Sequence, residues 1–235
     1  MTSPAFVGQR SRRPLARNRR DIAALAGAGR AARRRARTWW EVRAALRQVR
    51  RHSSHPAPIR ICWDLDNTLV NSGVLLREGH SLRDAIVRAD PVSNMLEFFA
   101  AVHSTLPDAD HFILTARVRA MRRDTETWLL RHGLAQIDAP LCLVPDVDAK
   151  KRVWELLART SRLVIIDDLS LNHEREEPTR NDDLIEIARR VAVVYIAADE
   201  IASIAGDSQA IDATVSRIIA GSHNVGTRTR LGENC

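Results

Sequence analysis

Side chains that can bind a cation or a phosphate occur at four separate places in this sequence of 235 residues. Each place lies at the end of a short apolar segment or shortly after one. The set contains four carboxylates, one hydroxyl and one ammonium group, namely Asp64, Asp66, Thr115, Lys150, Asp167 and Asp168. At about 4 Å and an effective dielectric constant of about 20, two carboxylates repel by about 4 kcal/mol, so the gathered set requires a cation. Oxygen ligands suit Mg²⁺, which also accepts substrate phosphate.

These residue types suit phosphoryl transfer. A carboxylate such as Asp64 can attack phosphorus and form an aspartyl-phosphate. A second carboxylate two residues later, Asp66, can protonate the leaving oxygen and then activate water. The hydroxyl of Thr115 and the ammonium of Lys150 would hold the phosphoryl oxygens, since phosphoryl transfer mainly demands positioning and charge stabilisation.

The lysine position is informative because the chain contains 36 basic residues and only two of them, Lys150 and Lys151, are lysines. Asp148 is predicted to cap a helix, which would place both lysines in its first turn. A cation there opposes the helix dipole by about 0.3–1 kcal/mol, so an anion-binding role is the natural explanation. We favour Lys150 over Lys151 for that role.

Short apolar segments alternate with segments of helical periodicity after residue 58. Strands are expected at 61–63, 111–114, 141–144, 163–166 and 192–197. Helices are expected at 91–102, 118–132, 149–159, 184–190 and 209–220, with Gly133 as a C-cap signal. This alternation predicts an α/β fold with a Rossmann-like doubly wound parallel sheet, whose carboxyl edge would gather the polar set.

The polar residues and their order resemble the four motifs of the haloacid dehalogenase-like (HAD-like) hydrolase superfamily over about residues 59–200. The matching segments are Asp64-Leu-Asp-Asn-Thr-Leu69 for the DxDx[TV] motif, Ile113-Leu-Thr115, Lys150, and Ile165-Ile-Asp167-Asp168. The resemblance implies that Asp64 is the nucleophile, Asp66 the general acid and base, and Thr115 and Lys150 the phosphate ligands. It also implies that Mg²⁺ binds to Asp64, to the backbone carbonyl of Asp66 and to Asp167, with Asp168 in support. The aspartate at position 66 is the phosphatase pattern, so the resemblance argues against dehalogenation.

Two further features bear on the substrate. The insert at 70–90 is too short for a large cap domain, so the site is expected to be open to a large substrate or closed by another subunit. Segment 115–129 faintly resembles the phosphatase half of polynucleotide kinases, through Thr115-Ala116-Arg117, Arg123, Thr125, Trp128 and Leu129. A nucleotide or nucleic-acid end phosphate is therefore one candidate substrate, and small phosphorylated metabolites are equally open.

Each of these residues also has a structural explanation. The aspartates at 64, 66, 167 and 168 can serve as strand-end and helix-capping residues, and Thr115 as a β-branched strand residue. Arg117 can contact a leaving group or be solvated. His173 with residues 174–177 reads more readily as a solvated loop than as a site, Cys62 as buried strand filler, and Trp63 as packing beneath the site.

The formal net charge of +7 is unevenly distributed. Residues 1–60 contain 16 arginines and two acidic residues, whereas the remainder contains 20 basic and 27 acidic residues. Residues 1–20 are expected to be disordered, 21–51 partly helical with Trp39, Val42, Leu46 and Val49 on one face, and 52–58 a linker. The alternative function is therefore binding of nucleic acid or a membrane surface by residues 1–51, with a weak or silent catalytic domain. The segment 1–58 equally resembles a transit peptide or a solvated extension, and 223–235 is expected to be a flexible tail.

Several classes of protein are disfavoured by the sequence. No segment approaches the roughly 20 apolar residues of a membrane-spanning helix, and no apolar signal-peptide region is present. Cys62, Cys142 and Cys235 form no CxxC pair, which disfavours a disulfide framework or structural zinc site. These features favour a reducing, cytoplasmic location.

Overall fold

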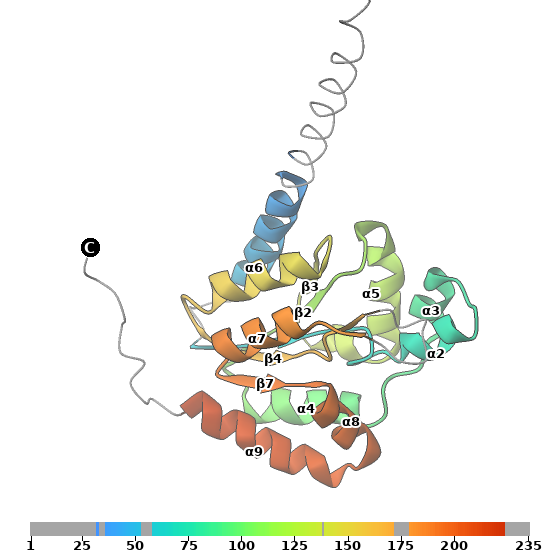
Figure 1. Ribbon diagram of the computed structural model, residues 1–235. Coiled ribbons are helices and arrows are strands. Elements are labelled where there is room, and N and C mark those ends of the chain that lie inside the picture. Colours follow the sequence, from blue (N-terminus) through green and yellow to red (C-terminus); the bar gives the residue numbers. More distant parts are fainter. Residues whose placement is uncertain (1–31, 33–35, 53–57, 138, 172–178, 224–235) are drawn as a thin grey trace, which may run out of the picture. The chain divides into compact units, whose positions relative to one another are not determined.

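The computed structural model describes residues 32, 36–52, 58–137, 139–171 and 179–223 (Figure 1). The chain divides into two units, residues 1–40 and 41–235. In the first unit the described residues are helical, and the rings of Trp39 and Trp40 meet edge to face with centroids 5.1 Å apart. The predictions for residues 1–20, for most of the linker, for the loop around His173 and for the C-terminal tail lie outside the described residues.

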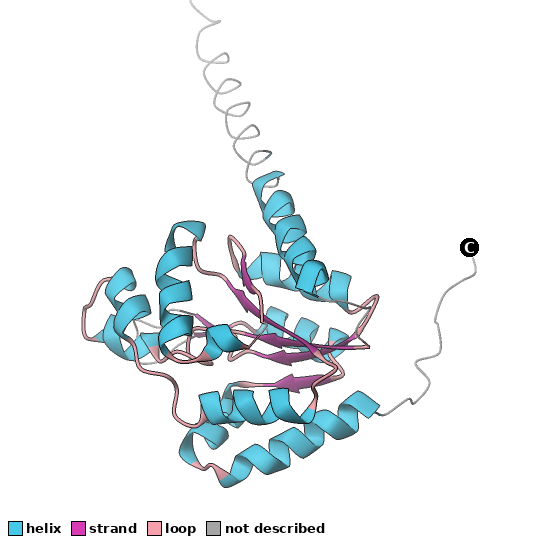
Figure 2. Cartoon of the chain, turned by 180° about the vertical axis from the view of Figure 1, so that it is seen from behind, coloured by secondary structure: helices cyan, strands magenta, loops and turns pink. Residues whose placement is uncertain are grey.

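The second unit is built around a five-stranded, entirely parallel sheet with the strand order β3-β2-β1-β4-β7. The strands are β1 (Ile59–Trp63), β2 (Asp110–Thr115), β3 (Leu141–Leu143), β4 (Arg162–Ile166) and β7 (Val194–Ile196). Helices cover both faces of the sheet (Figures 1 and 2). The predicted α/β class and Rossmann-like parallel sheet are therefore confirmed.

The core lies in two layers, one on each face of the sheet. Ile61 and Trp63 of β1 belong to one apolar cluster and Cys62 to the other, as the two-residue period of a strand requires. The first cluster packs against α4 (Met95–Thr105), α5 (Arg122–Arg131), α8 (Ala198–Gly206) and α9 (Gln209–His223). The second packs against helical residues 41–52, α6 (Val147–Leu157) and α7 (Asp182–Val191).

Helical residues 41–52 belong to the second unit rather than to a separate arm. Val42, Leu46 and Val49 are buried against the sheet, as their helical spacing predicts. Ala45 joins them, and its carbonyl accepts a hydrogen bond from the thiol of Cys142 at 3.7 Å. Trp39, which the same spacing placed on the apolar face, is 43% exposed.

The segment between β1 and α4 contains two short helices, α2 (Ser72–Arg77) and α3 (Leu82–Arg88), where the sequence predicted one excursion. The other short elements are η1 (Arg119–Met121), η2 (Leu134–Gln136) and the antiparallel pair β5 (Ser170–Leu171) and β6 (Thr179–Arg180). Gly133 has a φ of 77°, so the predicted helix end at this glycine is confirmed.

Two predicted helix starts differ from the structure. The N-cap of α6 is Asp146 and not Asp148, because the Asp146 carboxylate accepts a hydrogen bond from the backbone N–H of Ala149 at 3.0 Å. Helix α4 begins four residues later than predicted, after Asn94. Asn94 has a left-handed φ of 58°, and its side-chain amide donates to the Ile204 carbonyl at 3.0 Å.

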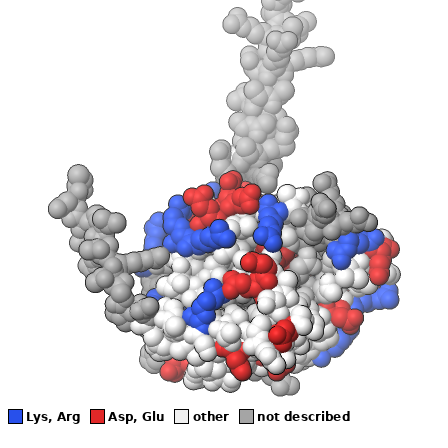
Figure 3. Space-filling model, turned by 60° about the horizontal axis from the view of Figure 1, so that its bottom comes forward, with Lys and Arg blue, Asp and Glu red and all other residues white. Residues whose placement is uncertain are grey.

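The described surface has mixed charge on the face shown in Figure 3, where acidic and basic side chains lie among uncharged ones. Among the described residues, every helix is too short or too polar to cross a bilayer.

Candidate active site at the carboxyl edge of the sheet

The candidate site lies where the strand order reverses. From β1 the chain adds β2 and β3 on one side and then crosses to add β4 and β7 on the other. In open α/β sheets, ligands bind in the crevice at this switch point, outside the carboxyl ends of the strands. Asp64 directly follows β1 and Asp167 directly follows β4, and the backbone N–H of Asp64 donates to the Ile166 carbonyl at 2.8 Å.

Three carboxylates meet at this crevice. Asp64, Asp167 and Asp168 each offer an oxygen within 4.8 Å of the others, and all three side chains are buried. Burial, followed by repulsion from Asp167, raises the pKa of Asp64 to about 7. Burial, followed by repulsion from Asp64 and Asp167, also raises the pKa of Asp168. Both shifts show that the three carboxylates together lack positive charge.

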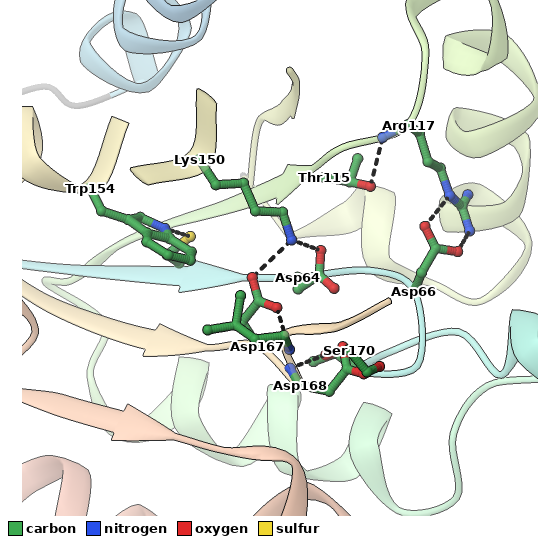
Figure 4. A network of polar contacts seen from close by, with 12 residues as sticks. Asp64, Asp66, Thr115, Arg117, Lys150, Trp154, Asp167, Asp168 and Ser170 are labelled. Carbon is green, nitrogen blue, oxygen red and sulfur yellow. Dashed lines mark hydrogen bonds and ion pairs between the residues drawn. The ribbon is translucent and has the colours of Figure 1, made fainter. Parts of the chain in front are cut away.

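Lys150 projects from α6 between two of these carboxylates (Figure 4). Its Nζ lies 2.6 Å from Asp64 Oδ1 and 2.8 Å from Asp167 Oδ2. Desolvation alone would lower the pKa of Lys150, but attraction to Asp167 and Asp64 outweighs it and raises that pKa. Lys151 is only partly buried, so Lys150 is the lysine that the fold brings to the carboxylates.

Asp66 lies apart from the three carboxylates and faces Arg117 instead (Figure 4). Arg117 donates to Asp66 from Nε at 2.9 Å and from Nη2 at 2.7 Å, and its Nη1 donates to Thr125 at 3.1 Å. The Ser72 hydroxyl donates to the same carboxylate at 2.7 Å. The arginine side chain is only 3% exposed, so the interpretation of Arg117 as a solvated residue is wrong.

Thr115 ends β2 and is almost completely buried. Its hydroxyl oxygen accepts a hydrogen bond from the backbone N–H of Arg117 at 3.3 Å, across the partly buried Ala116. Both Thr115 and Ala116 line the same cavity as the carboxylates. Of the other residues in the faint polynucleotide-kinase resemblance, Thr125, Trp128 and Leu129 are buried and Arg123 is exposed.

Hydrogen bonds join the loop after β1 to the loop after β4. The Thr68 hydroxyl accepts from the backbone N–H of Asp168 at 3.2 Å. Asp167 Oδ1 accepts from the N–H of Leu169 at 3.0 Å, and the Ser170 hydroxyl donates to Asp168. Tyr195, the single tyrosine of the chain, donates to the Asp167 carbonyl at 3.0 Å. These hydrogen bonds fix the positions of both loops.

Sequence reasoning missed four of these supporting residues, namely Thr68, Ser72, Ser170 and Tyr195. Thr68 stands inside the first motif and was available as a signal. The other three act through contacts that depend on the tertiary structure.

The site opens into a cavity of about 250 Å³. Asp64, Asp66, Asp167 and Lys150 line it, together with residues of α2, α3, η1, α6 and α7. The insert at 70–90 therefore forms part of the wall, through Ser72, Leu76 and Leu82.

The donor set fits a hard divalent cation. Asp64, Asp167 and Asp168 supply only oxygen ligands, which is the preference of Mg²⁺. Lys150 supplies one positive charge against three carboxylates, and the raised pKa of Asp64 shows the remaining deficit.

The chemical interpretation of this site rests on its residues and their geometry. The predicted set of residues lies around one cavity, with Asp168 beside it in the carboxylate cluster. Comparison of the chain with protein-family models, with curated proteins and with solved structures found no match.

Proposed function

We propose that this protein is a Mg²⁺-dependent phosphomonoester hydrolase of the haloacid dehalogenase-like type that forms an aspartyl-phosphate on Asp64. The observation that supports the proposal most strongly is the contact of Lys150 with Asp64 and Asp167 at the switch point of the sheet. A buried nucleophile, a cation and a second acidic group thus share one cavity.

In the first step, an oxygen of Asp64 bonds to phosphorus while the ester P–O bond breaks. The leaving oxygen takes a proton from Asp66, which two residues separate from the nucleophile. In the second step, water bonds to phosphorus and loses a proton to Asp66, while the bond between phosphorus and Asp64 breaks. Both steps balance without any oxidant or reductant.

The remaining residues stabilise charge. Lys150 lies beside Asp64 and would contact a phosphoryl oxygen, and the hydroxyl of Thr115 would bind another. Asp64, Asp167, Asp168 and the backbone carbonyl of Asp66 would hold Mg²⁺, which neutralises the charge between the nucleophile and the phosphate.

The test replaces the nucleophile while keeping the size of the side chain. Asp64→Asn should abolish hydrolysis of 4-nitrophenyl phosphate in the presence of Mg²⁺, with circular dichroism and thermal unfolding confirming that it folds. Asp148→Asn, at an exposed position of α6, is the matched control and should keep wild-type turnover. Full activity of Asp64→Asn would refute the proposal.

A second candidate function, binding of nucleic acid or an anionic membrane, is supported by the charge of the N-terminal segment. Residues 1–40 contain 11 arginines and one acidic residue. Because residues 41–52 pack into the second unit, a truncation that tests this function should begin at Glu41 and not at residue 59. Unchanged binding to oligonucleotides and anionic vesicles after truncation would exclude the segment as a binding element.

A further inference from the structure

The upper wall of the cavity is apolar. Six side chains on five elements or loops form it, namely Leu76, Leu82, Val118, Met121, Val147 and Leu184. Leu82 on α3 is 46% exposed and Val118, in the loop before η1, is 47% exposed. Among described residues of the second unit, the large apolar side chains with such exposure are these two and Leu130. Two of the three therefore lie at this cavity, and exposed apolar groups gathered at a cavity indicate a binding surface.

The cations at the cavity are already paired. Arg117 and Lys150 are the basic residues among its described lining, and they contact Asp66 and the pair Asp64 and Asp167, respectively. Three lining carboxylates against two cations leave a formal charge of −1. A divalent cation changes this to +1, which suits one phosphate group and provides no partner for a second anionic group.

The polar side chains of the wall are also engaged. Ser72 donates to Asp66, and Ser170 donates to Asp168. The side-chain oxygen of Asn181 caps α7 by accepting from the N–H of Leu184. A leaving group with several hydroxyls would lose its hydrogen bonds to water without gaining equivalents here, whereas an apolar one would not.

From these observations we infer that the substrate is a monophosphate ester with an uncharged, apolar leaving group of about one ring, which packs on Leu82 and Val118. The inference rests on the proposed function and names the substrate class of the same site. The cavity volume of about 250 Å³ sets the size, because pockets for drug-sized ligands span roughly 300–1,000 Å³.

The experiment compares esters of similar chemical reactivity. 2-Phenylethyl phosphate, glycerol 1-phosphate and phosphoserine are all esters of primary alcohols, but only the first has an apolar, uncharged leaving group. The full-length protein with Mg²⁺ should show a kcat/KM for 2-phenylethyl phosphate about tenfold or more above those of the other two.

Variants then locate the preference on the wall. Leu82→Asp and Val118→Asp should each reduce the ratio of kcat/KM for 2-phenylethyl phosphate to that for glycerol 1-phosphate by about fivefold or more. Leu130→Asp is the matched control, because Leu130 is 67% exposed on α5 and does not line the cavity. This control should keep the wild-type ratio.

The outcomes separate this inference from the proposed function. Hydrolysis of all three esters with equal kcat/KM, or an unchanged ratio in both wall variants, overturns the inference and leaves the phosphatase proposal standing. Absence of hydrolysis of any ester by the wild-type protein overturns both. The comparison of substrates on the wild-type protein requires no variant to fold.

Discussion

Arg117 holds Asp66 by both carboxylate oxygens, with Nε 2.9 Å from Oδ2 and Nη2 2.7 Å from Oδ1. The two residues are 51 positions apart in the chain, and Thr125 on α5 binds the same guanidinium group. A bidentate pair fixes both the position and the plane of a carboxylate. In the proposed mechanism, Arg117 is therefore a positioning residue for the general acid and base.

Arg117→Lys should lower kcat for 2-phenylethyl phosphate by about 10- to 100-fold, because a single ammonium cannot hold Asp66 in the same plane. The decisive measurement is a double-mutant cycle. In an Asp66→Asn background, Arg117→Lys should cost less than about threefold, since the group that it positions is already absent. Arg119→Lys, at an exposed position in η1, is the control. Additive losses would show that Arg117 does not act through Asp66.

Lys150→Met should unfold more readily than the wild type, because it leaves Asp64 and Asp167 buried and mutually repelling. Loss of one partner from a buried ion pair costs about 3–5 kcal/mol. Mg²⁺ should restore part of the lost free energy of unfolding, measured by urea titration with Mg²⁺ or with EDTA. Lys151→Met, at the partly exposed neighbouring position, should change neither value by more than about 0.5 kcal/mol. Equal effects at both lysines would contradict the site geometry.

Mg²⁺ should raise the melting temperature of the wild-type protein and should be required for turnover. A ligand at 100 times its dissociation constant stabilises the folded state by about 2.7 kcal/mol. Asp167→Asn should remove most of this stabilisation, whereas Asp183→Asn, exposed on α7, should retain it. The measurement is differential scanning fluorimetry across a Mg²⁺ titration. A wild-type melting temperature that does not respond to Mg²⁺ would count against the metal site.

His111 should make the protein less stable in acid. Burial, followed by repulsion from His103, lowers the pKa of His111 to about 3 from 6.5, and its Nδ1 accepts a hydrogen bond from Trp63 at 3.2 Å. Below pH 6.5 the unfolded state binds a proton that the folded state does not bind, so the free energy of unfolding falls until about pH 3. At pH 4.5 this group alone should account for a loss of about 2.7 kcal/mol.

His111→Gln isolates that contribution, because glutamine can accept the Trp63 hydrogen bond and does not titrate. Urea unfolding at pH 7.5 and pH 4.5 should show a smaller fall for the variant than for the wild type. The carboxylates that titrate in the same range are common to both proteins, so they cancel in the comparison. Equal falls would mean that His111 does not drive the acid sensitivity.

The sequence predicted the sheet and the gathering of the polar residues because both depend on local signals. Short apolar segments such as 163–166 locate parallel strands, and carboxyl ends of parallel strands meet at one edge. Asp64, Asp167 and Lys150 could therefore be placed together before any coordinates were known. Their chemical roles remain proposals.

The features that could not be predicted depend on contacts distant in sequence or on competing local choices. The Arg117–Asp66 pair forms only because β1 and β2 lie side by side. Asp146 and Asp148 are equally good caps by type, and the tertiary structure selects the first. Burial of residues 41–52 likewise required knowledge of the sheet face that their apolar side chains cover.

The hydrogen bond between Thr68 and the backbone of Asp168 joins residues 100 positions apart. The nucleophile and the second acidic pair therefore come together only after β1 has paired with β4 across that length of chain. Contacts of such sequence separation are slow to form, because loop closure must precede them. During refolding, recovery of catalysis should consequently report the pairing of β1 with β4, whereas recovery of helical circular dichroism should not.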